Sequence, residues 1–130
     1  MNGSLIDTGI IVKVLRGDAK TVDFLNSLGS EVFISVVVVG ELLFGANKSI
    51  KTEQNKQLVR EQIDRFEILS IDMEIAKMYG QIKIDLMKSG FTIPENDLWI
   101  AATAQKYGLA LATFDNHFKY INSIQTVSIE

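Results

Sequence analysis

Four carboxylates stand at positions where acidic side chains could do chemistry, namely Asp7, Glu41, Asp97 and Asp115. Asp7 and Asp115 each follow a short apolar run, and Asp97 lies in the first turn of an expected helix. In open α/β sheets, ligands bind at the edge formed by the carboxyl ends of parallel strands. Four carboxylates gathered there would repel one another unless a cation lay among them. Such a cluster suits Mg²⁺ or Mn²⁺, and the pattern therefore indicates metal-dependent phosphodiester chemistry.

Each acid also has an ordinary structural interpretation, and that of Glu41 is a residue on the solvent-facing side of its helix. Asp7 could cap the helix that follows it, Asp97 could cap its own helix, and Asp115 could be a solvated loop residue. Asp7-Thr8-Gly9 also matches the short signature of aspartic proteases. That signature spans three residues, and those enzymes are nearly all-β, whereas most of this chain has helical periodicity. The protease interpretation therefore stays a minor alternative.

Composition limits which metal site is possible. The 130 residues fit a single domain over 1–130 and are enough to bury a core. The chain has no cysteine, which excludes disulfides, thiolate nucleophiles and structural zinc of the Cys type. One histidine, His117, excludes a His-rich catalytic metal site. We therefore expect any metal to be bound by oxygen ligands.

The charge balance gives no overall attraction for nucleic acid, because the net charge is −3. An RNA substrate would depend on a bound metal and on local basic residues. Lys13, Arg16 and Lys48 are the candidates for phosphate contacts, although each is also a plausible surface charge. No apolar run approaches membrane-spanning length and no leader pattern opens the chain, so we expect a cytoplasmic protein without a membrane partner.

The segment holding Asp97 is the clearest in the chain. Pro94, the only proline, prevents a helix from running through from the residues before it. Asn96 offers an N-cap, and a helix from Asp97 should end at Gly108. The apolar run at 109–113 then suits a buried strand, which places the last acid just past a strand end.

The segment holding Glu41 allows two interpretations. Its β-branched residues favour a strand as far as Val39. Ser35 could instead be an N-cap that starts a helix at Val36. In that case Glu41 is a carboxylate inside an otherwise apolar helix, where burial is costly unless the charge is paired or bound to metal.

The remaining segments alternate between strands and helices. The alternation predicts an α/β fold with a largely parallel sheet. The expected strands are 4–7, 66–71 and a final edge strand at 125–129, and the expected helices are 10–16, 21–28, 48–65 and a helix capped by Asp72 that runs to Lys88.

Four motifs resemble the PIN-domain nucleases and, among these, the VapC-type toxins of bacterial toxin–antitoxin pairs. The motifs are Leu5-Ile6-Asp7-Thr8, Gly40-Glu41-Leu42, Asn96-Asp97-Leu98-Trp99-Ile100-Ala101-Ala102 and Thr113-Phe114-Asp115. The resemblance covers essentially the whole chain and implies a three-layer α/β/α fold with a mainly parallel central sheet. It implies an endoribonuclease that uses Mg²⁺ or Mn²⁺ and hydrolyses RNA phosphodiester bonds with metal-activated water. It further implies a homodimer and a cognate antitoxin.

By the same resemblance, the four carboxylates fall on the family's acidic quartet, with catalytic and metal-binding roles. Thr113 falls on the small hydroxyl residue that supports the site, and Glu41 is assigned to a helix. Gly9 departs from the pattern, since the family usually has Asn there, and an Asn could orient Asp7. This departure leaves one alternative, a catalytically weak or inactive PIN-like module that binds RNA or protein.

Overall fold

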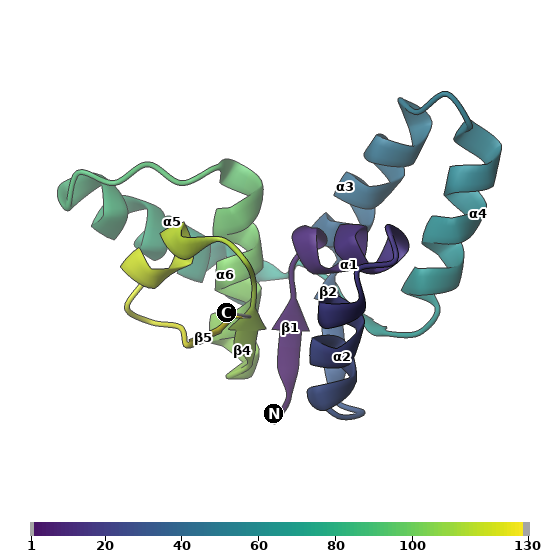
Figure 1. Cartoon of the computed structure of the whole chain (residues 1–130). Coiled ribbons are helices and arrows are strands. Elements are labelled where there is room, and N and C mark those ends of the chain that lie inside the picture. Colours follow the sequence, from purple (N-terminus) through teal and green to yellow (C-terminus); the bar gives the residue numbers. More distant parts are fainter. Residues whose placement is uncertain (1, 129–130) are drawn as a thin grey trace.

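A five-stranded sheet forms the centre of the computed structural model, which describes residues 2–128 (Figure 1). The strand order is β3-β2-β1-β4-β5, and all neighbouring strands pair in parallel. The predicted α/β fold with a mainly parallel sheet is therefore confirmed. The strands are β1 (Ser4–Ile6), β2 (Val32–Ser35), β3 (Glu67–Leu69), β4 (Ala110–Ala112) and β5 (Thr126–Val127).

Helices cover both faces of this sheet, as the predicted three layers require (Figure 1). The chain moves outward from β1 to β3 in one direction, then returns past β1 to β4 and β5 on the other side. Right-handed crossovers therefore carry the first four helices to one face and the last two to the other. The helices are α1 (Thr8–Leu15), α2 (Ala19–Ser27), α3 (Val36–Asn47), α4 (Thr52–Ile63), α5 (Met73–Lys88) and α6 (Glu95–Tyr107), followed by a short 3₁₀ helix, η1 (Asn116–Tyr120).

The ambiguous segment around Glu41 is resolved by a cap. The Ser35 hydroxyl accepts a hydrogen bond from the Val37 backbone N–H at 3.1 Å, so β2 ends at Ser35 and α3 begins at Val36. In the same way Asp72 accepts from the Ile75 N–H at 2.9 Å and starts α5, as predicted.

The predicted N-cap at Asn96 is wrong. Helix α6 begins at Glu95, because the Pro94 carbonyl already accepts hydrogen bonds from the N–H groups of Asp97 and Leu98. Proline has a fixed φ and no N–H, which makes it compatible with a helix start. The predicted stop is confirmed, since Gly108 has the left-handed φ of 64° that ends α6.

Other boundaries also differ from the prediction: α2 begins two residues before the predicted 21, and β3 is shorter than the predicted 66–71. Helix α1 already begins at Thr8, because Asp7 caps it. The predicted helix over 48–65 begins only at Thr52, whose hydroxyl donates to the Ser49 carbonyl in the turn before it. The predicted last strand is seen at 126–127, and Ile129 lies outside the described residues.

The core lies on both sides of the two central strands. Leu5 and Ile6 of β1 and Leu111 of β4 have no solvent exposure, and neither does Ile100 of α6. Each such side chain contributes roughly 1.5–3 kcal/mol of burial free energy. The ends of β1 and β4 are therefore held rigidly. No helix within residues 2–128 is both long and apolar enough to cross a membrane.

Candidate functional site

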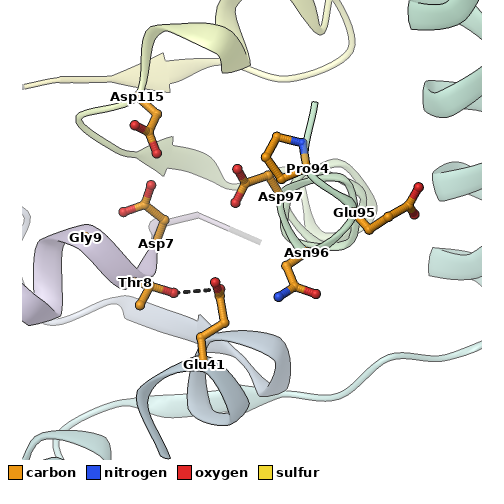
Figure 2. A pocket seen from close by; sticks show the side chains of 9 residues that line it. All are labelled: Asp7, Thr8, Gly9, Glu41, Pro94, Glu95, Asn96, Asp97 and Asp115. Atoms are coloured by element: carbon orange, nitrogen blue, oxygen red, sulfur yellow. Dashed lines mark hydrogen bonds between the residues drawn. The ribbon is translucent and has the colours of Figure 1, made fainter. Parts of the chain in front are cut away.

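A pocket of about 410 Å³ opens at the carboxyl ends of β1 and β4 (Figure 2). This is the point at which the chain reverses its direction across the sheet, where ligands bind in open α/β folds. Its volume is in the range of small-ligand sites. The lining residues are Asp7, Thr8, Gly9, Glu41, Pro94, Glu95, Asn96, Asp97 and Asp115.

All four carboxylates predicted from the sequence meet in this pocket. Asp7 follows β1, Glu41 comes from α3, Asp97 from the first turn of α6, and Asp115 follows β4. In Figure 2 the three aspartate side chains point toward one another, and Glu41 approaches from the α3 side. Four separate elements thus deliver one acidic group each, which local capping alone does not require.

Asp7 is the most deeply buried of the four, with 4% of its surface exposed. One carboxylate oxygen accepts from the Ile10 N–H at 3.4 Å and caps α1, so the structural interpretation of Asp7 also holds. Burial raises the pKa of Asp7 from 3.8 to about 6; the hydrogen bond from Thr113 opposes the rise, and the charge of Asp115 adds to it. Burial and the neighbouring acids therefore disfavour the charged form of Asp7.

Thr113 connects two of the acids. Its buried hydroxyl donates to Asp7 and accepts from the Asp115 backbone N–H at 3.0 Å. One side chain at the end of β4 therefore fixes both the Asp7 carboxylate and the backbone that carries Asp115.

Glu41 has a milder environment than the sequence suggested. The Glu41 carboxylate accepts a hydrogen bond from the Thr8 hydroxyl at 2.8 Å (Figure 2). Glu41 is only partly buried, because its side of α3 faces the pocket and not the core. The apolar neighbours along the chain therefore did not predict its surroundings.

Asp97 is close to a residue that the sequence did not select. The His117 Nε2 atom lies 2.9 Å from the Asp97 carboxylate, and Asp97, Asp115 and His117 each offer a donor atom within 4.8 Å of the others. Burial raises the pKa of Asp97; His117 opposes the rise, and Glu41 and Asp115 add to it. The structure therefore places one nitrogen donor beside the carboxylate oxygens expected from the sequence. The sequence could have indicated His117 by its position, since it lies only two residues after Asp115.

The first turn of α6 contributes two further lining residues. Asn96, expected to be a cap, lines the pocket, whereas Glu95 points away from the aspartates in Figure 2. Glu95 pairs instead with Lys83 and Tyr79.

Gly9 leaves room beside Asp7. A Cβ atom at this position would lie 3.5 Å from an Asp7 carboxylate oxygen and 3.9 Å from the Phe114 ring, which are ordinary contacts. A side chain is therefore sterically possible at Gly9, and its absence leaves this side of Asp7 open.

The three basic candidates flank the acidic pocket. Arg16 and Lys48 line a neighbouring groove between α1, α3 and α4, which shares Thr8 and Glu41 with the pocket. The Lys13 ammonium lies 4.3 Å from the centre of the Phe114 ring, next to Asp115.

The donor set fits a divalent cation. Carboxylate oxygens are the ligands that Mg²⁺ and Mn²⁺ prefer, and here they gather around one pocket. Burial raises the pKa of both Asp7 and Asp97, so each buried charge would be stabilised by a cation.

The parallel sheet and the acidic pocket at its reversal point define a class of protein, an α/β domain whose strand ends present clustered carboxylates. The family model of the PIN domain matches residues 4–123, and this chain belongs to the PIN-domain family.

Named relatives agree with this assignment. Ribonuclease VapC2 of Haemophilus influenzae is 34% identical over 110 residues, which cover 84% of this chain and 83% of the relative. The tRNA(fMet)-specific endonuclease VapC of Salmonella typhimurium is 29% identical over 127 residues, covering 97% and 95%. Among solved structures, VapBC2 from Rickettsia felis bound to a DNA fragment from its promoter superposes with a TM-score of 0.92. It is 28% identical, and both chains are covered completely.

Proposed function

We propose that this protein is a metal-dependent endoribonuclease and the toxin of a toxin–antitoxin pair. The observation that carries the proposal is the meeting of four carboxylates, each from a different element, in one pocket. The similarity to VapC2 of Haemophilus influenzae, named a ribonuclease, and to a VapC named an endonuclease supports the reaction class. The family relationship supports an antitoxin as partner.

In this proposal Asp7, Glu41, Asp97 and Asp115 hold one or two Mg²⁺ or Mn²⁺ ions. A bound ion of this kind activates water and neutralises charge on phosphoryl oxygens during in-line displacement. The protein's own contribution is orientation. Thr113 holds the Asp7 carboxylate, and the Thr8 hydroxyl holds Glu41 at 2.8 Å.

RNA must approach a pocket that is itself acidic, on a chain with a net charge of −3. We assign the phosphate contacts to Lys13, Arg16 and Lys48, which flank the pocket on two sides. Cations in these positions would attract the phosphates on either side of the cleaved bond.

The proposed antitoxin site is the groove between α1, α3 and α4. Its volume is about 510 Å³, and it joins the acidic pocket at Thr8 and Glu41. An apolar antitoxin segment in this groove would also close one side of the pocket. The groove lies beside α3 and α4, the helices that hold Phe44 and Leu58, and Leu58 lines it. The apolar residues lining the groove are Val12, Leu15, Leu42, Ala46, Leu58 and Val59.

Two further parts of the proposal concern assembly. We propose that residues 1–130 act as a single PIN domain and that two copies associate as a homodimer.

The toxin assignment is tested by expressing the chain in bacteria with and without the protein encoded beside its gene. Sequencing of RNA 5′ ends should reveal new ends only when the chain is expressed alone, together with growth arrest. An Asp7→Asn/Asp97→Asn protein made at the same level is the control and should produce neither. New ends and arrest of equal size from this control would refute the assigned chemistry.

A further inference from the structure

His117 is the one histidine of the chain, and its ring lies beside Asp97, which lines the acidic pocket. The residue lies on η1, directly after the β4 end that carries Asp115. Its ring packs on Phe118 with ring centres 4.6 Å apart, and Phe118 is completely buried. The imidazole therefore lies next to a core residue, with 30% of its side chain exposed.

The contact between His117 and Asp97 is unusual for a hydrogen bond. The two atoms lie 2.9 Å apart, yet Nε2 is buried and has no partner in hydrogen-bond geometry. A buried polar atom without a partner is costly, and such atoms commonly bind a ligand, an ion or a water.

The same distance fits two ligands of one ion. In an octahedral site with bonds of about 2.1 Å, neighbouring ligand atoms lie about 3.0 Å apart. The Asp115 carboxylate offers a third donor within 4.8 Å of both. The three donors come from α6, the end of β4 and η1, so three separate segments bring them within 4.8 Å of one another.

We propose that His117 Nε2 is a ligand of the active-site metal, together with Asp97 and Asp115, and that it shifts the ion preference of the site from Mg²⁺ toward Mn²⁺. This inference rests on the metal site of the proposed function. Imidazole nitrogen binds transition metals well, whereas Mg²⁺ prefers oxygen ligands. A nitrogen ligand therefore favours Mn²⁺ over Mg²⁺, and a site made only of carboxylates lacks this source of preference.

A positioning role for His117 makes a different prediction. If the imidazole only oriented the Asp97 carboxylate, its loss would weaken the binding of both ions by the same factor. A ligand role lowers the affinity for Mn²⁺ more than that for Mg²⁺, because only Mn²⁺ gains from nitrogen.

The test uses metal-free full-length protein in three forms. These are the natural sequence, His117→Gln, which offers an amide oxygen in place of the nitrogen, and Lys119→Gln, an exposed control on the same 3₁₀ helix. Electron spin echo envelope modulation of the Mn²⁺-loaded proteins reports nitrogen bound to the ion. Calorimetric titration with Mn²⁺ and with Mg²⁺ gives the ratio of the two affinities.

We expect ¹⁴N modulation in the natural and Lys119→Gln proteins and none in His117→Gln. The ratio of Mn²⁺ to Mg²⁺ affinity should fall by at least about tenfold in His117→Gln only. Mn²⁺ binding without ¹⁴N modulation in the natural protein overturns the role of His117 and leaves the proposed function standing. A natural protein that binds no Mn²⁺ overturns both.

Discussion

The buried charge of Asp7 should make the metal-free protein less stable at neutral pH than at mildly acidic pH. The pKa of Asp7 is about 6 in the folded chain, against an ordinary value of 3.8. Between these values the folded state keeps a proton that the unfolded state has lost. The free energy of unfolding therefore falls as pH rises from about 4 to about 6 and is level above that. The difference of the two values, 6 − 3.8, corresponds to about 3 kcal/mol.

Replacing Asp7 by Asn should recover most of this free energy. Asn keeps the size of the side chain and an oxygen for the Ile10 N–H that Asp7 now caps at 3.4 Å. It loses the carboxylate oxygen that accepts from Thr113, which costs about 1 kcal/mol. Asp7→Asn should therefore stabilise the metal-free protein by about 2 kcal/mol at pH 7 and not at pH 4.

Urea unfolding in EDTA at pH 4 and at pH 7 measures this difference directly. Asp23→Asn is the matched control, because Asp23 is exposed on α2 and does not line the pocket. The reasoning is refuted if Asp7→Asn is destabilised at pH 7, or if its stability differs from that of the natural protein equally at both pH values. With added Mn²⁺ the natural protein should be more stable than Asp7→Asn, because metal binding stabilises only the protein that retains the site.

Three further predictions concern the other parts of the account. Glu41→Gln keeps an oxygen for the Thr8 hydroxyl, so thermal melting in EDTA should hold or rise, while RNA cleavage falls by at least about a hundredfold. Early melting with cleavage at the natural rate would show that Glu41 is structural. Leu58→Asp places a charge in the apolar groove and should weaken antitoxin binding by at least about tenfold, measured by calorimetry. Ile50→Asp changes a fully exposed residue outside the groove and should not weaken antitoxin binding. Equal losses of affinity in the two variants would contradict the groove assignment. Light scattering at micromolar concentration should give twice the monomer mass of 14.5 kDa, and the monomer mass alone would contradict the homodimer.

The sequence was most informative where chemistry and periodicity coincide. Asp7 and Asp115 could be placed together because each ends an apolar run, and the carboxyl ends of parallel strands share one edge. Gly108 could be identified as a helix end because its left-handed φ of 64° suits glycine. These features depend on local backbone rules, which a single sequence contains.

The missed features depend on contacts between distant segments. His117 lies beside Asp97 while the next residue, Phe118, is buried in the core, and no local pattern encodes that packing. The hydrogen bond from Thr8 to Glu41 forms because α1 lies beside α3. The start of α6 was displaced because the Pro94 carbonyl serves as the first acceptor, which competes with the side-chain cap that Asn96 offered.

The central claim is that the four carboxylates hold the metal on which RNA cleavage depends. The most direct measurement is the cleavage rate of purified, EDTA-treated protein as Mn²⁺ is added back, for the natural chain and for Asp7→Asn/Asp97→Asn. We expect that neither protein cleaves RNA before Mn²⁺ is added. The natural chain should then recover its full cleavage rate, and the double variant should not cleave at any Mn²⁺ concentration. Cleavage by the natural chain in excess EDTA, or recovery of the double variant to the natural rate, would contradict the account.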